Sequence, residues 1–426
     1  MSGLMQRGRT LISSALAALA VFGIAILPAF MLSVRGAAFL SFLLLLIAAI
    51  WSMLAAPAEA MNRLRAMWRE YRWLILAMAA MPTAMLISAL LNPAAPRNVP
   101  FAYGRLWLFG LALFALLQLR PKQLESVQWG CVAGALASVV WAYLELRIGR
   151  PDKIGAFANT IPFGNLSLLM GLFSLISIGW SNRDGWPLIL LRVFAGGAGL
   201  YASYLSQSRG GWIAIPILLL IAVATLRHVS WKKRATALLV FFALLVTVCV
   251  SSSMVRTRFG QAMEDIHAYQ AGQTNTSVGI RFQLWKAATL MLTRHPLAGV
   301  GRGQFEPALK AIHAEGLITQ EATAFEHAHN EFLYNGATLG VLGIGALLAL
   351  YLVPAVYFLR AALCDDRVLR TTGAMGLTLC VGFVLFGLTE VMLIIAQTVV
   401  FYSVMVAVFT AHIHRRRQQL GAAPVL

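Results

Sequence analysis

The segment His327-Ala328-His329-Asn330-Glu331 contains the residues best suited to proton transfer. A histidine side chain ordinarily titrates at about pH 6.5, so it can accept a proton near neutrality. Two histidines beside carboxylates could also bind a metal. However, residues two apart lie on different faces of a helix, and the sequence has no His-Glu-x-x-His pattern. We therefore favour a single base, His329, over a metal site; a surface histidine above an ordinary packing face is the other alternative.

Three glycines follow this segment at Gly336, Gly340 and Gly343. On a continuous helix of about 3.6 residues per turn, they would lie within roughly 40° of His329. The pattern predicts a stripe without side chains beside the imidazole. Another helix or a ligand could approach the backbone closely there.

Two arginines stand in settings that suit an anion. Arg209 precedes two glycines at the start of an apolar span, where free N–H groups and the helix dipole favour negative charge. A tight turn with a snorkelling arginine is the alternative. Arg281 and Trp285 are four residues apart and share a helix face, which suits phosphate and sugar contacts. An amphipathic helix lying on a membrane surface is the alternative there.

A glycine-rich segment, residues 294–305, contains Arg302. No Gly-Lys-Ser/Thr follows it and no predicted strand precedes it, so it does not resemble a nucleotide-binding loop. We expect a mainly structural role for its glycines. Charged residues near the ends of apolar spans, among them Arg147 and Glu390, are further candidates, because charge is costly in a membrane and is frequently functional there.

The composition is that of a membrane protein. Hydrophobic residues make up 59% of the chain, charged residues 12%, and the mean hydropathy is +0.75, whereas soluble domains are about a quarter charged. The formal charge of +18 comes largely from short loops between apolar spans, so it does not indicate nucleic-acid binding. The four cysteines fit neither a disulfide framework nor a zinc site.

About twelve apolar spans are long enough to cross a bilayer core of roughly 30 Å, and the first is expected to be an uncleaved helix. They lie at about 10–32, 37–56, 73–91, 101–119, 125–146, 161–180, 187–207, 210–228, 235–254, 336–359, 371–389 and 391–412. The longest segment without such a span is 255–335, in which we expect helices at about 255–270, 279–294 and 303–315.

The charge distribution predicts the orientation. With a cytoplasmic N-terminus, the inner loops contain 19 of the 34 lysines and arginines, and both termini are cytoplasmic. The sequence then divides into transmembrane helices 1–9 (residues 1–254), a periplasmic helical loop with catalytic residues (255–335), and helices 10–12 with a cytoplasmic basic tail (336–426). Arg209, Arg281 and His329 all map to the outer face, where cations beside a base suggest an anionic lipid head group such as a lipid pyrophosphate.

Four motifs resemble the O-antigen ligase family. They are Ser208-Arg209-Gly210-Gly211, Arg281-x-x-x-Trp285, His295-Pro296-Leu297-x-Gly299-x-Gly301, and His329-Asn330 followed after nine residues by Gly340-Val341-Leu342-Gly343. The twelve-span layout with a large outer loop before span ten is also similar.

The resemblance implies a glycosyltransferase with a GT-C-like fold in the bacterial inner membrane. It would be metal-independent, inverting and cofactor-free, and would transfer a glycan from undecaprenyl pyrophosphate to a hydroxyl of lipid A–core. His329 would be the catalytic base, and Arg209 and Arg281 the essential arginines. The expected substrate-binding residues are Arg147, Trp285, Arg302, His327, Asn330 and Gly340.

Three alternatives stay open. O-antigen polymerases and protein O-oligosaccharyltransferases share the layout and similar motifs. A transporter or flippase of lipid-linked glycans would instead require ionisable residues near mid-membrane and repeated halves.

Overall fold

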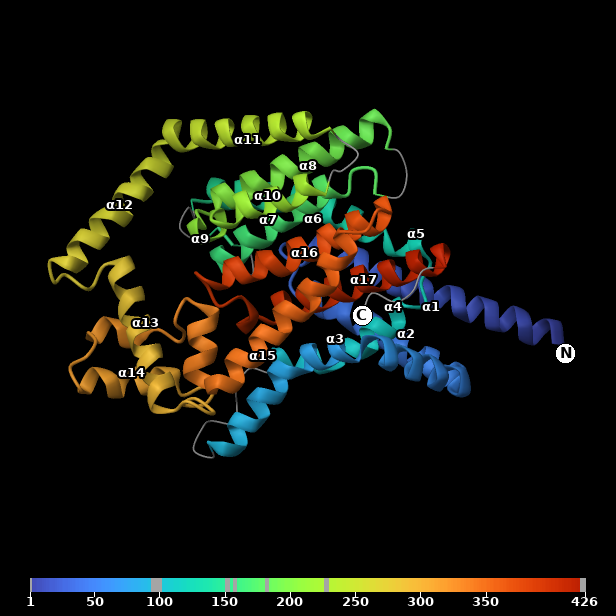
Figure 1. Cartoon of the computed structure of the whole chain (residues 1–426), viewed down its shortest axis with the longest axis horizontal. Helices are drawn as coiled ribbons and strands as arrows, with labels where there is room; N and C mark the ends of the chain where they lie inside the picture. Colours follow the sequence, from blue (N-terminus) through green and yellow to red (C-terminus); the bar gives the residue numbers. More distant parts are fainter. Residues whose placement is uncertain are drawn as a thin grey trace.

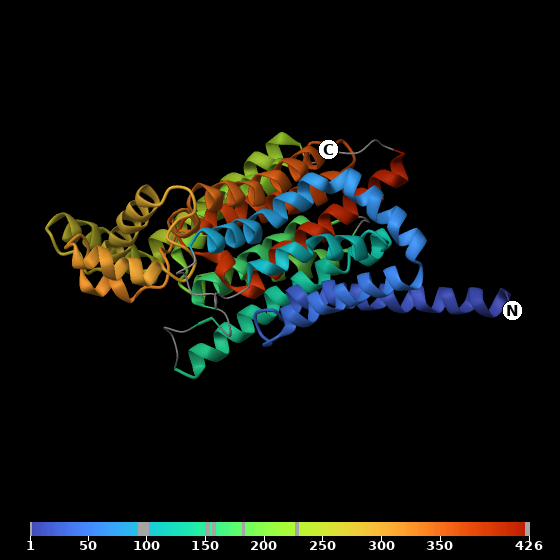
Figure 2. The ribbon, with the colours of Figure 1, turned by 90° about the horizontal axis from the view of Figure 1, so that it is seen from below.

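The computed structural model describes residues 2–92, 102–149, 154–155, 159–180, 184–225 and 230–421. Throughout these ranges every regular element is a helix, which confirms the all-helical fold class. Figures 1 and 2 show the long helices running roughly along the longest axis of the molecule. Helices α13 (Ser277–Arg294) and α14 (Phe305–Ala314) form a head at one end, and the first turns of α1 (Ser2–Phe30) project at the other.

The helices before the head occupy two stretches of the chain. The first comprises α1 (Ser2–Phe30), α2 (Ala37–Ala55), α3 (Pro57–Leu91), η1 (Tyr103–Leu108), α4 (Phe109–Leu116), α5 (Pro121–Leu124) and α6 (Val127–Arg147). The second comprises α7 (Thr160–Ile176), α8 (Trp186–Leu205), α9 (Arg209–Trp212), α10 (Ala214–Ala224) and α11 (Trp231–Ser251).

The head and the C-terminal helices complete the chain. The segment that leads into and builds the head contains α12 (Ser253–Gln270), α13 (Ser277–Arg294), α14 (Phe305–Ala314) and η3 (Gln320–Ala324). The last helices are α15 (Glu331–Ala362), α16 (Arg367–Gly387), η4 (Met392–Ile394) and α17 (Ala396–Leu420). In Figure 1, α11 lies at the edge of the bundle, and α12 leads from it to the head.

Seven helices in the described part of the chain are long and apolar enough to cross a membrane, and four shorter apolar helices accompany them. Helix α17 is the most enclosed of the seven, with 89% of its apolar window buried. Each predicted span coincides with a helix or a pair of consecutive helices, α11 among them. The structure therefore supports a helical membrane protein, while the count of twelve crossings stays a prediction.

Polar caps begin the helices that surround the head. Ser252 Oγ accepts the Val255 N–H at 3.3 Å at the start of α12, and Thr276 Oγ1 accepts the Gly279 N–H at 3.1 Å at the start of α13. Such caps satisfy N–H groups that have no partner within the helix, each worth about 1 kcal/mol. Helices α12 and α13 consequently begin within two residues of the positions expected from the sequence.

Two apolar cores hold the molecule together. The larger joins the long helices of the bundle, and the smaller lies under α13, α14 and η3. The smaller core also includes Ala328 and Tyr334 beside the histidines and Val391 from the loop between α16 and α17. The head is thus packed directly onto the ends of the C-terminal helices.

The expected glycine stripe is wrong in its geometry. His329 precedes α15, and Gly340 (φ 64°, ψ −153°) breaks the helix, so the glycines do not form one face with His329. The segment around residues 296–301 runs along the break: the Val341 N–H donates to Pro296 O at 2.8 Å, and the Gly301 N–H donates to Thr338 O at 3.0 Å. The close approach that glycine permits is therefore made by the chain's own backbone.

Candidate active site

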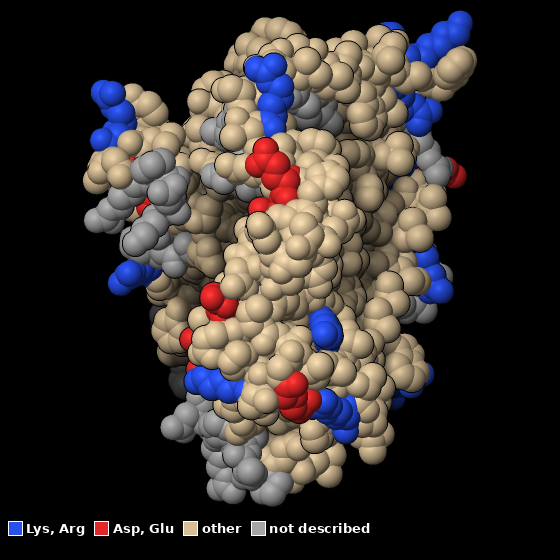
Figure 3. All heavy atoms as spheres, turned by 90° about the vertical axis from the view of Figure 1, so that its left-hand side faces the viewer, with Lys and Arg blue, Asp and Glu red and all other residues tan. Residues whose placement is uncertain are grey.

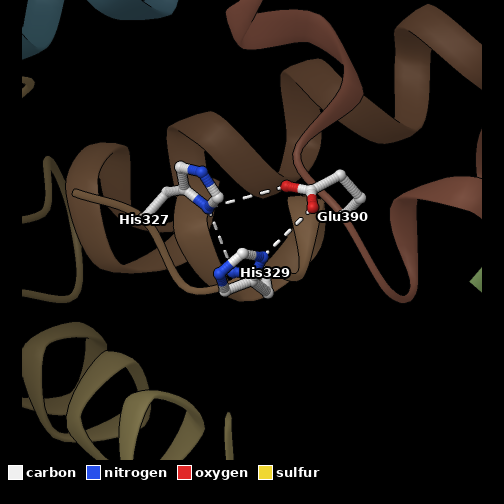
Figure 4. Close-up of side chains that lie close together, drawn as sticks. All are labelled: His327, His329 and Glu390. Atoms are coloured by element: carbon white, nitrogen blue, oxygen red, sulfur yellow. Dashed lines mark hydrogen bonds and ion pairs between the residues drawn. The ribbon is translucent and has the colours of Figure 1, made fainter. Parts of the chain in front are cut away.

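Two histidines and one glutamate meet where the head joins the bundle (Figure 4). His329 Nδ1 lies 3.1 Å from Glu390 Oε2, and His327 Nδ1 lies 3.7 Å from Glu390 Oε1. The Glu390 side chain is 3% exposed, against 17% for His329 and 20% for His327. The glutamate is therefore enclosed, and the two imidazoles that contact it are partly exposed.

When both imidazoles are neutral, the hydrogen bonds assign them opposite tautomers. An ionised carboxylate can only accept, so His329 carries its hydrogen on Nδ1 and leaves Nε2 with a free lone pair. His327 Nδ1 accepts the backbone N–H of His329 at 3.3 Å, so its hydrogen is on Nε2. Only His329 therefore presents a basic ring nitrogen that is not already used.

The pKa shifts of Glu390 and His327 are consistent with these hydrogen bonds. Burial alone would raise the pKa of Glu390, but the hydrogen bond from His329 and the nearby imidazoles outweigh burial and lower it. Burial lowers the pKa of His327 despite the attraction of Glu390. Near neutral pH, Glu390 is accordingly ionised and His327 is neutral.

The backbone around His329 is held in an uncommon conformation. His329 has φ 48°, one of two positive values outside glycine among the described residues. The Trp285 indole N–H donates to Ala328 O at 3.0 Å, and Asn330 Oδ1 caps α15 by accepting the N–H groups of Phe332 and Leu333, both at 3.0 Å. Contacts on both sides thus maintain a conformation that costs about 1–3 kcal/mol.

Helix α13 presents Arg281 on the side of the histidines. Trp285 touches the segment between His327 and His329, and Arg281 lies one turn earlier on the same face of α13. Arg281 is partly exposed, and among the described residues it has neither a hydrogen bond nor an ion pair. Its guanidinium is therefore available to a ligand.

The segment of Arg209 packs against the same loop as Glu390. The Arg209 side chain lies outside the described part of the structure, but its backbone begins α9. A Cβ added at Gly210 would come 2.7 Å from Thr389 Cβ and closer still to the Thr389 hydroxyl. The backbone next to Arg209 therefore touches the residue before Glu390.

Asn165 of α7 contacts both the segment of Arg209 and the loop of Glu390. It is fully buried; its Oδ1 accepts the Ser208 hydroxyl at 3.3 Å, and its Nδ2 contacts Met392 Sδ at 3.4 Å. A side chain at Gly211 would overlap Asn165 Oδ1. One buried amide thus joins the arginine segment to the Glu390 loop.

Arg302 and Gly340 are packed against other parts of the protein near the site. The Arg302 guanidinium is buried between the rings of Tyr103 (5.1 Å) and Tyr334 (4.6 Å), and it donates to Asn335 Oδ1. A Cβ at Gly340 would lie 2.5 Å from the carbonyl oxygens of Pro296 and Leu297. Both expected ligand-binding residues therefore contact protein groups.

Arg147 is separate from this group. It ends α6, is exposed, and its guanidinium lies 5.7 Å from the Tyr143 ring. Among the described residues, Arg147 has no hydrogen bond or ion pair with the histidines. Its role in binding substrate stays a prediction.

His327, His329 and Glu390 could also ligate a metal, because their donor atoms lie within 4.8 Å of one another. In the hydrogen-bonded arrangement described above, His329 Nδ1 carries a hydrogen and cannot act as a ligand. The expectation of a site without metal stays a prediction.

The sequence did not indicate how these residues meet. Glu390 was a candidate only as a charge near a span end, and Glu331 only as a carboxylate beside a possible metal site. Asn165 was not a candidate. An asparagine or glutamate within or beside an apolar span was the available signal.

The surface at the head end carries charges of both signs, scattered over mostly uncharged residues (Figure 3). The face shown has no broad field of one sign among its described residues. Recognition of an anion here therefore depends on individual arginines.

Comparison with known proteins gives one family match and two similar proteins. Residues 194–348 match a family model described as O-Antigen ligase, and this region contains Arg209, Arg281 and His329. The chain is 24% identical over 279 residues to an uncharacterized protein of Haemophilus influenzae, covering 65% of this chain and 69% of that protein. It is also 24% identical over 255 residues to the O-antigen ligase of Escherichia coli, covering 58% of this chain and 60% of that protein. The resemblance drawn from the motifs is confirmed.

Proposed function

We propose that this member of the O-antigen ligase family transfers a glycan from undecaprenyl pyrophosphate to a hydroxyl of lipid A–core, on the periplasmic face of the inner membrane. The observation that carries the proposal is the contact of His329 Nδ1 with the enclosed Glu390 at 3.1 Å. The segment of Arg209 packs against the loop of Glu390, and the face of α13 that carries Arg281 contacts Ala328 through Trp285. A base with a free Nε2 and two guanidinium groups would then converge on one place.

The proposed step is a displacement at the anomeric carbon of the donor. The acceptor oxygen forms the new bond to carbon, its proton passes to His329 Nε2, and the bond to the pyrophosphate oxygen breaks with its electron pair. Attack from the side opposite the leaving group inverts the anomeric configuration. General-base help of this kind is typically worth about 10²–10⁴-fold.

The arginines would receive the charge that develops on the leaving group. A guanidinium offers a planar pair of donors that matches phosphate oxygens, and it is always protonated. Because pyrophosphate leaves as a stabilised anion, the site needs no protonated acid beside it. The uncompensated Arg281 suits this role, and Arg209 would join it from α9.

The shape of the molecule supports the proposed orientation. The head lies at one end of the long helices, whereas α1 begins and α17 ends away from it (Figures 1 and 2). With the head in the periplasm, both termini are cytoplasmic, as the basic inner loops predict. The lipid tail of the donor would remain in the bilayer while its head group reaches His329.

The proposal can be tested with purified protein in lipid vesicles that contain a lipid-linked glycan. Lipid A–core, unlinked donor glycan and a serine-containing peptide are offered as acceptors in separate reactions. Glycosylated lipid A–core is the expected product, and its formation should survive EDTA. Products only on the glycan or peptide would indicate a polymerase or a protein-glycosylating enzyme. Movement of donor across the bilayer without any product would indicate a transporter.

A further inference from the structure

The loop that carries Glu390 is tied to the first turn of α15 at two points. The Asn330 side-chain amide donates to Leu388 O at 3.0 Å, two residues before Glu390. Three residues after Glu390, the Leu393 N–H donates to Glu331 Oε2 at 3.0 Å. Neighbouring residues of the histidine segment thus hold both sides of the glutamate that contacts His329.

Glu331 is fully buried and accepts hydrogen bonds from three elements. Its Oε2 accepts the Leu393 N–H, and its Oε1 accepts the Tyr103 hydroxyl at 3.0 Å and the Asn335 amide at 3.2 Å. The donors come from η4, η1 and α15. A carboxylate is costly to bury unless it is fully hydrogen-bonded, and here both of its oxygens are used.

The Glu331 carboxylate is connected to the buried guanidinium of Arg302 through Asn335. Arg302 donates to Asn335 Oδ1, and the Asn335 amide donates to Glu331. The chain of contacts therefore runs from Arg302 through Asn335 and Glu331 to Leu393. It connects the glycine-rich segment to the Glu390 loop through protein groups alone.

We propose that Glu331 is a positioning residue, which sets the distance between Glu390 and His329 by fixing the backbone of the Glu390 loop. The inference rests on the proposed function, because it concerns the base of that reaction. A hydrogen bond of 3.1 Å is lost when the loop moves by about 1 Å, and misplacement of that size can lower a rate by about 10²-fold. Glu331 would act only through Glu390.

Replacement by glutamine separates these roles. Glu331→Gln keeps the shape but leaves one oxygen for three donors, so at least one contact fails. We expect kcat for glycan transfer to fall by about 10²-fold, with KM for the lipid-linked donor within about twofold of wild type. Tyr103→Phe, which keeps the bond to Leu393, is the matched control and should lower kcat much less.

A double-mutant cycle with Glu390→Gln tests whether the effect passes through Glu390. In that background, Glu331→Gln should lower kcat by less than about twofold. A further 10²-fold loss, a wild-type rate for the single variant, or a glutamine variant that no longer folds in detergent would each overturn the inference. Failure of the proposed function is distinct, since the wild-type protein would then form no transfer product.

Discussion

Replacing Glu390 with glutamine should disable His329 without removing it. The Val391 N–H donates to Glu390 Oε1 at 2.9 Å, so the glutamine oxygen is expected at that position. Its NH₂ group then takes the place of Oε2, which lies 3.1 Å from His329 Nδ1. A donor there requires a lone pair on Nδ1, so the imidazole hydrogen moves to Nε2 and the base is blocked.

The expected loss is large because the change affects the tautomer. Replacing the aspartate of a serine-protease triad by asparagine acts in the same way and lowers kcat by about 10⁴-fold. Because general-base help is worth about 10²–10⁴-fold, we expect Glu390→Gln to lower kcat within that range. Glutamine has the same shape as glutamate, so thermal stability in detergent should change little.

The pH profile provides a second test of the same variant. In the wild-type protein, the lowered pKa of Glu390 keeps it ionised and the lowered pKa of His327 keeps it neutral, so both groups hold their state as pH falls moderately below neutrality. The rate should nevertheless fall on acidification, because a general base must be unprotonated to accept the proton of the acceptor hydroxyl. In Glu390→Gln this acid limb should weaken.

Initial rates of glycan transfer between pH 5 and 9 are the measurement, with exposed Glu326→Gln as the control. The control should keep both the rate and the acid limb. A Glu390→Gln protein within about threefold of wild type at every pH would refute the tautomer argument.

Three further predictions follow from the same geometry. Gly210→Ala should lower the rate of glycan transfer by about 10²-fold, because the new methyl group displaces the Glu390 loop. Gly197→Ala is the control: a methyl group there has no atom within 4 Å, so the transfer rate should be unchanged. Equal rates for the two variants would contradict the packing argument. Arg281→Lys should lower kcat by about 10²–10³-fold, since it keeps charge but loses the paired donors, and near-normal turnover would remove Arg281 from the reaction. In a background without the native cysteines, a cysteine at exposed Ala271 should react with a membrane-impermeant reagent added outside, and one at exposed Ala66 should not; the reverse labelling would invert the proposed orientation.

The helices could be predicted from the sequence because their signals are local. Apolar runs of membrane length and polar residues at helix starts depend only on neighbours in the chain. The prediction for 279–294, for example, lies within two residues of α13 (Ser277–Arg294). The motifs also indicated His329, Arg281 and Trp285, which the structure places around one segment.

The partners of these residues could not be predicted, because they come from distant parts of the chain. Glu390 is 61 residues from His329, and nothing local in the sequence indicates that they meet. The glycine stripe failed for a related reason: the positive φ at Gly340 is stabilised by the segment at 296–301, which a helical projection of α15 alone does not include.

The most direct test of the account compares His329→Ala with His327→Ala in the purified transfer reaction. His329→Ala should abolish formation of glycosylated lipid A–core while it still binds the lipid-linked donor, because the two arginines proposed to hold the pyrophosphate remain. His327→Ala should retain substantial activity, since its imidazole supports the backbone of His329 and presents no free lone pair. Substantial transfer by His329→Ala, together with loss of transfer in His327→Ala, would contradict the assignment of His329 as the base.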